Sequence, residues 1–158
     1  AKTPHELFLI NLIFNHILIF VTVLGLAKSY PQGLLLVPAI SFGVTGYILW
    51  RAVRAKRQDP WFVNGHWQIA ARRSRLFMAM LLFMAGVSLL GWVGYTYLGM
   101  MKVAVYALIG GVGMFPTMIA VLVLILLESE SMHQARHGQM PAWMEARFPD
   151  SPLPVVHK

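Results

Sequence analysis

The chain of 158 residues contains no cysteine and only six acidic residues, against 13 lysines and arginines. The absence of cysteine excludes disulfide bonds, thiolate metal sites and thiol redox chemistry, and with them the quinone-linked disulfide oxidoreductases of membranes. Charge is also missing from long parts of the chain. Four apolar stretches contain no Asp, Glu, Lys or Arg, except Arg51 at the end of the second. Such stretches are typical of membrane-spanning helices.

The four apolar stretches cover residues 8–27, 34–52, 76–98 and 103–127. Each is close to the roughly 20 residues that a helix needs to cross a bilayer. The hydrophobic fraction of 58% and the mean hydropathy of +0.63 exceed the values usual for a soluble domain. We therefore predict an all-α fold, a bundle of four transmembrane helices within residues 1–127. The first stretch is longer than a typical signal-peptide core, so we expect it to stay as a helix.

Basic residues are divided unequally between the two ends of the predicted helices. Seven of the 13 fall in or beside the predicted loop at residues 53–75, namely Arg51, Arg54, Lys56, Arg57, Arg72, Arg73 and Arg75. The opposite turns hold only Lys28 and Lys102. The positive-inside rule places the loaded loop in the cytoplasm, so both termini are expected there too (N-in, C-in). A bacterial cytoplasmic (inner) membrane fits this asymmetry.

The same basic residues are expected to set the topology and to contact the headgroups of anionic lipids. In a soluble protein the net charge of +7 would suggest nucleic acid as a partner. Here the charge sits beside apolar spans, so we expect no nucleic-acid binding.

The loop between the second and third stretches predicts a short interfacial helical segment. Asp59-Pro60 is a signal for a helix start, and aromatic residues then alternate with polar ones. Asn64-Gly65 is the expected turn into the third span.

Helix ends are expected at both extremes of the chain. Thr3 and Glu6 fit a capping box at the start of the first helix. The fourth helix is expected to continue out of the membrane to about residue 137. The rest of the cytoplasmic tail, residues 128–158, is expected to be extended, apart from a short amphipathic piece between Pro141 and Pro149.

Polar side chains inside the predicted spans are the first candidate site. They are Asn11, Asn15, His16, Ser41, Thr45 and Thr117. Polar groups at the bilayer centre are costly and suggest a proton relay, a ligand contact or an axial haem ligand. They also act as hydrogen-bonding contacts between helices or with a partner chain. Either way, we expect Asn15 and His16 to face protein and not lipid.

Glycine and proline in the fourth stretch predict a helix break, formed by Gly110, Gly111, Gly113 and Pro116. Pro116 removes one backbone hydrogen bond, and the glycines allow close approach of a neighbour or unwinding of the helix. Close approach is a packing device. Unwound helices of this kind bind substrates in transporters.

Glu130, His133 and His137 fall on one face of the extended fourth helix. Glu-x-x-His is a ligand pattern of di-metal helical bundles, and two histidines one turn apart can hold one ion. A solvated helix face has the same appearance, so the pattern leaves both interpretations open.

The sequence favours a non-catalytic accessory, assembly or stabilising subunit of a larger inner-membrane complex, partnered by other membrane-protein subunits or by itself. No buried charge pair and no convergent catalytic set are expected, and the surface is rich in aromatic residues and methionine. One alternative is a small homo-oligomeric transporter or channel that uses His16 and the Gly110–Pro116 break. Another is a haem- or metal-binding redox subunit. The sequence itself requires no cofactor, and haem would need a second ligand because the other spans contain no histidine.

Overall fold

The computed structural model describes residues 1–26 and 29–147 of the chain. Every secondary-structure element in these ranges is a helix. Four helical rods are long and apolar enough to cross a membrane: Thr3–Leu26, Leu36–Gln58, Trp61–Tyr97 and Lys102–Arg136. The prediction of an all-helical protein with four candidate spans is confirmed.

The rods form two antiparallel hairpins. The first hairpin contains α1 (Thr3–Ile10), the π-helix η1 (Asn11–Ile19), α2 (Phe20–Leu26), the 3-10 helix η2 (Pro31–Leu35) and α3 (Leu36–Gln58). The second contains α4 (Trp61–Tyr97), α5 (Lys102–Ala107), the π-helix η3 (Leu108–Met114) and α6 (Phe115–Arg136). A short helix, α7 (Ala142–Arg147), follows.

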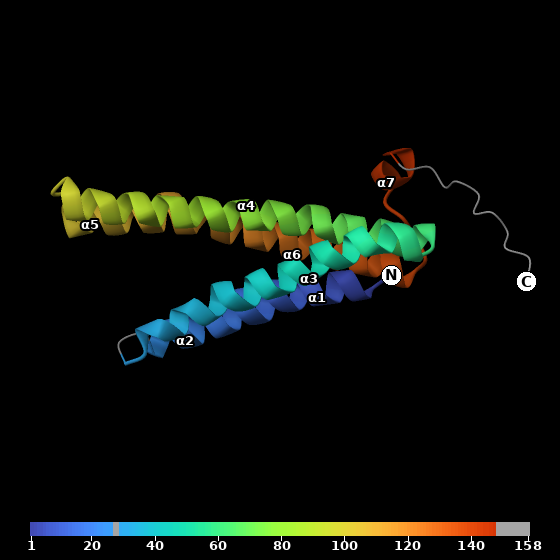
Figure 1. Cartoon of the computed structure of the whole chain (residues 1–158), viewed down its shortest axis with the longest axis horizontal. Helices are drawn as coiled ribbons and strands as arrows, with labels where there is room; N and C mark the ends of the chain where they lie inside the picture. Colours follow the sequence, from blue (N-terminus) through green and yellow to red (C-terminus); the bar gives the residue numbers. More distant parts are fainter. Residues whose placement is uncertain (27–28, 148–158) are drawn as a thin grey trace, which may run out of the picture.

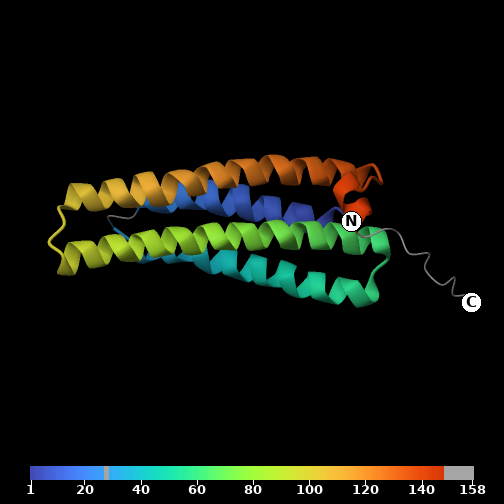
Figure 2. The ribbon, with the colours of Figure 1, turned by 90° about the horizontal axis from the view of Figure 1, so that it is seen from above.

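The two hairpins meet at one end and diverge toward the other (Figure 1). We call the end where α1 begins and α6 ends the junction end, and the opposite end, with α2 and α5, the open end. At the junction end α1 packs against α3, α4 and α6, and α3 packs against α4. At the open end α2 packs mainly against η1 and η2 of its own hairpin. Seen from above, all four rods run along one common axis (Figure 2).

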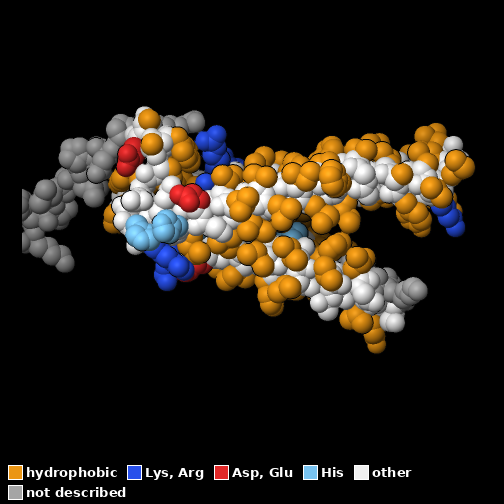
Figure 3. All heavy atoms as spheres, turned by 180° about the vertical axis from the view of Figure 1, so that it is seen from behind, with side chains coloured by type: hydrophobic (Ala, Val, Ile, Leu, Met, Phe, Trp, Pro, Cys, Tyr) orange, Lys and Arg blue, Asp and Glu red, His pale blue; other side chains and the backbone are white. Residues whose placement is uncertain are grey.

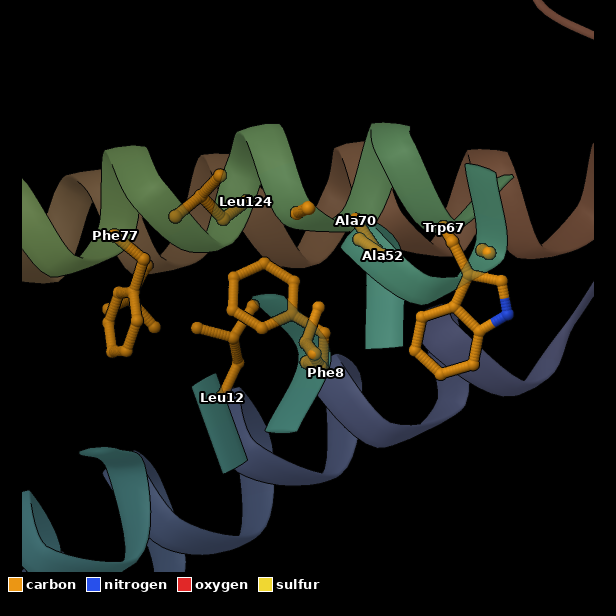
Figure 4. Packing of buried hydrophobic residues seen from close by; sticks show 11 residues of the cluster. Phe8, Leu12, Ala52, Trp67, Ala70, Phe77 and Leu124 are labelled. Carbon is orange, nitrogen blue, oxygen red and sulfur yellow. The ribbon is translucent and has the colours of Figure 1, made fainter. Parts of the chain in front are cut away.

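The apolar core lies toward the junction end. Phe8 and Leu12 of the first rod are fully buried against Phe77 of α4 and Leu124 of α6 (Figure 4). Alanines, among them Ala52 and Ala70, keep the side chains between α3 and α4 small and let these helices approach closely. Beyond this core the arms of both hairpins are covered by hydrophobic side chains, and charged side chains gather mainly at the junction end (Figure 3).

The prediction of a separate interfacial segment was wrong. Helix α4 runs unbroken from Trp61 to Tyr97, so Asn64 and Gly65 lie inside it and form no turn. The Asn64 side chain accepts a hydrogen bond from Gln68 one turn later, at 3.0 Å. Gly65 is buried beneath Met140 of the segment before α7. Because Gly65 has no side chain, the Met140 side chain can pack directly against α4 at this point. Only Asp59 and Pro60 separate α3 from α4.

The ends of the chain differ in detail from the expectations. Thr3 lies within α1 and makes no capping bond, and Glu6 forms an ion pair with Lys2 at 3.3 Å. Helix α6 ends at Arg136, as predicted to within one residue. The amphipathic piece is the helix α7, so the tail is not simply extended after residue 137. Lys28 and residues 148–158 lie outside the described residues.

Close packing between α4 and the return rod depends on Gly91. A β-carbon at Gly91 would lie 3.2 Å from Val105 Cγ1 and 3.3 Å from two side-chain atoms of Ile109. We expect Gly91→Val to lower the free energy of unfolding by about 1–3 kcal/mol through overpacking. The matched control is Gly86→Val, because nothing lies within 4 Å of a β-carbon there. Denaturation in mild detergent measures the free energy of unfolding of both variants. Equal values would contradict the close packing at Gly91.

Candidate functional site

Four ionisable side chains from three helices meet inside the junction end. His5 of α1 lies between Glu128 of α6 and His66 of α4, with Nδ1 2.5 Å from Glu128 Oε2 and Nε2 2.9 Å from His66 Nδ1. Arg73 of α4 donates to the other carboxylate oxygen, Glu128 Oε1, at 3.0 Å. The side chains of His5, His66 and Glu128 are fully buried. We call these four residues, together with Ser131, the junction cluster.

Helical spacing explains how these residues come together. His66 and Arg73 are seven residues apart, which places them two turns apart on one face of α4. Glu128 directly follows the apolar run of α6, and Ser131 lies one turn beyond it on the same face. Arg73 Nη1 also contacts Ser131 Oγ at 2.9 Å and the backbone carbonyl of Leu127 at 2.8 Å.

The buried carboxylate of Glu128 is stable only because it has partners. Removing an ion from water costs several kcal/mol, which a well-placed counter-charge and additional hydrogen bonds offset. Arg73 supplies the counter-charge and His5 supplies a further donor. His5 is the member of the junction cluster that the first hairpin provides, so its contacts tie the two hairpins together.

Hydrogen-bond chemistry limits the protonation states of the junction cluster. His5 Nδ1 faces a carboxylate oxygen, so this nitrogen carries a proton. His5 Nε2 and His66 Nδ1 then share one proton, which either ring can hold. These contacts form a continuous hydrogen-bonded array from Arg73 through Glu128 and His5 to His66. It does not continue along the first rod, because the buried Phe8 and Leu12 come next.

A second cluster of polar side chains lies in the middle of the first hairpin. Asn11 Nδ2 donates to Ser41 Oγ of α3 at 3.3 Å, and Asn15 Nδ2 donates to Asn11 Oδ1 at 3.1 Å. Asn15 Nδ2 also donates to the backbone carbonyl of Val37 at 2.8 Å. Both asparagines are at most 2% exposed, so Asn15 faces protein, as expected, and Asn11 does so too. Thr45 is buried beside this hairpin interface, but its hydroxyl has no hydrogen-bond partner.

His16 has a different environment from the asparagines. Its Nδ1 bonds the carbonyl of Asn11 in its own rod at 3.0 Å, and its ring meets Phe77 of the second hairpin edge-on, with centroids 4.7 Å apart. Its Nε2 is buried without a hydrogen-bond partner. His16 therefore faces protein, but the expected polar partner on another helix is not there.

Asn11, Asn15 and His16 all belong to the π-helix η1. A π-helical turn has hydrogen bonds from residue i to residue i−5, and such turns are frequent at functional sites. The bond of the His16 side chain spans the same five residues. This bond to the Asn11 carbonyl therefore sets the orientation of the imidazole ring.

The glycine-rich part of the fourth rod is not unwound. The segment containing Gly110, Gly111 and Gly113 is the π-helix η3, which continues directly into α6. A β-carbon at Gly113 would lie 3.3 Å from Val87 Cγ1, so this glycine allows close approach of α4. Thr117 donates to the Gly113 carbonyl at 2.8 Å and does not join the other polar residues. The packing interpretation describes this segment better than a break.

Two of the arginines expected at lipid headgroups have internal contacts. Arg51 pairs with Asp59 at 2.8 Å and stacks on Trp67, and Arg73 belongs to the junction cluster. Arg54 and Arg72 are exposed and stack on Trp50 and Trp143. Lys56, Arg57 and Arg75 are also exposed.

The face with Glu130, His133 and His137 shows local contacts only. Glu130 accepts a hydrogen bond from Gln134, and the two histidine rings lie 4.2 Å apart. His137 Nδ1 contacts the carbonyl of His133. Among the described residues, no group of three or more His, Asp or Glu side chains is arranged to hold a metal ion.

The sequence analysis did not identify the junction cluster, and its expectation of no buried charge pair was wrong. Arg73 and Glu128 form such a pair, with the Glu128 side chain fully buried. A signal was present: a glutamate at the end of an apolar run, and a histidine and arginine two turns apart on the facing helix.

Removing the charge of Glu128 tests whether the junction cluster holds the hairpins together. Glu128→Gln leaves Arg73 without its counter-ion, so we expect the free energy of unfolding to fall by about 3 kcal/mol. Glu130→Gln is the matched control, because Glu130 is exposed and its hydrogen bond goes to Gln134 of the same helix. Unfolding of both variants in mild detergent gives the comparison. A loss no larger for Glu128→Gln than for the control would refute the role.

Comparisons with protein-family models, with curated proteins and with solved structures find no match to this chain. Its function is therefore inferred from the geometry of the two clusters and of the two hairpins.

Proposed function

We propose that this chain is a non-catalytic accessory, assembly or stabilising subunit of a larger membrane complex, and that partner helices pack into the fork between its two hairpins. The observation that carries the proposal is the divergence of the hairpins (Figure 1). At the open end α2 packs mainly within its own hairpin, although both arms are apolar. Helix association in a membrane depends on packing contacts, and the fork leaves such surfaces unused.

Buried polar atoms of the first hairpin that have no hydrogen-bond partner among the described residues support a protein partner. Asn15 Oδ1, His16 Nε2 and Thr45 Oγ1 are buried without hydrogen bonds to any residue in the ranges 1–26 and 29–147. Acyl chains cannot satisfy them, whereas a side chain of a partner helix can. A small adjustment of the hairpins around a seated helix would bring donors to these atoms.

The junction cluster favours a structural role over a catalytic one. His5, His66 and Glu128 are fully buried, and their polar atoms bond to one another and not to a space that a substrate could enter. Their contacts join α1, α4 and α6, so the cluster holds the hairpins together at one end while the other end is left for partners.

We place the junction end in the cytoplasm of a bacterial inner membrane, with both termini on that side. The basic side chains Arg54, Lys56, Arg57, Arg72 and Arg75 are exposed at this end. At the turn between α4 and α5 at the open end, the basic residue is Lys102, the first residue of α5. This is the charge distribution of the positive-inside rule.

Reporter fusions test the orientation. A reporter active only in the cytoplasm should be active after residue 158 and inactive when inserted at Gly99 in the turn between α4 and α5. A reporter active only outside should show the reverse pattern. Activity of the outside reporter after residue 158 would refute the cytoplasmic location of the junction end.

A second candidate, a haem-binding redox subunit, is favoured by one feature of His16. Its Nδ1 bonds a backbone carbonyl while Nε2 has no partner. Ligating histidines in metal and haem sites are held in this way, with the second nitrogen left for the metal. Phe77 covers the ring in the free chain, so this role needs the hairpins to move apart.

Purification in mild detergent separates these functions. Stable co-purifying subunits support the proposal, a visible Soret band supports the redox candidate, and a symmetric homo-oligomer alone supports a small transporter. We expect the double change Asn15→Leu and His16→Leu to weaken co-purification of the partner severalfold, because these polar atoms then cannot bond to it.

Thr22→Leu is the control for the double variant. Thr22 lies in the same rod, is exposed, and bonds only its own backbone at Leu18 within the described structure. It should leave co-purification unchanged. Full assembly of the double variant together with loss of function would shift the assignment to direct chemistry at His16.

A further inference from the structure

One face of α3 near the junction end carries a shallow hollow of about 400 Å³. It is lined by Trp50, Val53, Arg54, Arg57 and Gln58. These positions repeat every three or four residues, so they form a single stripe along the helix. The stripe faces away from the core, because the buried positions of α3 include Ile48, Ala52 and Ala55.

Two arginines in this stripe have no counter-charge. Arg54 and Arg57 are exposed and form no ion pair within the described residues, whereas Arg51 of the same helix is paired with Asp59. Arg54 and Arg57 are three residues apart and are therefore neighbours on the helix surface. Together they present an uncompensated double positive charge.

Arg54 is already held in place. Its guanidinium carbon lies 5.4 Å from the centroid of the Trp50 ring, and its Nε donates to Gln58 Oε1 at 2.9 Å. A guanidinium has five N–H donors, so those on the two terminal nitrogens remain for an acceptor. Their planar, forked arrangement fits two oxygens of one phosphate group.

The stripe lies at the level along α3 where lipid headgroups are expected. Trp50 stands at the end of the apolar part of α3, where tryptophan prefers the membrane interface. Val53 and the Trp50 ring offer an apolar surface beside the two charges. A ligand that fits has an anionic phosphate next to a hydrocarbon chain.

We propose that this stripe binds the phosphate group of an anionic phospholipid, with Arg54 and Arg57 on the phosphate and Trp50 and Val53 beside the acyl chains. The site is independent of the fork and of the proposed subunit role. It also separates two arginines that bind lipid, Arg54 and Arg57, from two that stabilise the protein, Arg51 and Arg73.

Native mass spectrometry of the full chain in mild detergent tests the site, by titration with phosphatidylglycerol and with phosphatidylcholine. The wild-type chain should bind phosphatidylglycerol more tightly. Arg54→Gln should weaken this binding about fivefold, the effect of one basic residue at a membrane surface. Arg54 is exposed, so the helical circular dichroism of the variant should be unchanged.

The matched control is Arg75→Gln, which removes the same charge from an exposed position on α4 outside the stripe and should weaken phosphatidylglycerol binding much less than Arg54→Gln does. An equal loss in both variants would show diffuse electrostatic attraction and overturn the site. Equal binding of the two lipids would overturn it as well. A large excess of inorganic phosphate separates the possible sources. If it displaces the lipid completely, the stripe is a free-phosphate site and the lipid assignment is wrong.

Discussion

The buried carboxylate of Glu128 is the constraint on which the arrangement of the two hairpins depends. It lies out of contact with water and must be paired with cations and donors from neighbouring helices. Arg73 meets it from α4 and His5 meets it from α1. These contacts fix the junction end, and the apolar layer of Phe8 and Phe77 packs directly beside it.

The hairpins diverge beyond that apolar layer because few polar contacts connect them there. The asparagines of η1 bond mainly within the first hairpin, to Ser41 and to the Val37 carbonyl. His16 reaches the second hairpin through its ring contact with Phe77 and forms no hydrogen bond to that hairpin among the described residues. A chain that is tied firmly at one end and loosely at the other can adapt to a partner. This property is what the proposed subunit role requires.

The sequence alone determined the number of spans and their approximate ends. Uncharged runs of about 20 residues are long enough to cross a bilayer as helices, in which every backbone group is bonded within its own segment. It also indicated that Asn15 and His16 face protein, because unpaired polar groups are costly among acyl chains. Local signals were less reliable: Asn64-Gly65 resembles a turn, yet tertiary packing against Met140 keeps this segment helical.

The tertiary structure alone decided which charged residues are internal and which are exposed. Arg51 and Arg73 cannot be distinguished in the sequence from Arg54 and Arg57, because all four are arginines near the ends of apolar runs. His5 and Glu128 are 123 positions apart, and their contact depends on the register between α1 and α6. That register is set by the packing of buried side chains across helices. Hydrophobic periodicity reports which face of a helix is buried, but not which residue of another helix it meets.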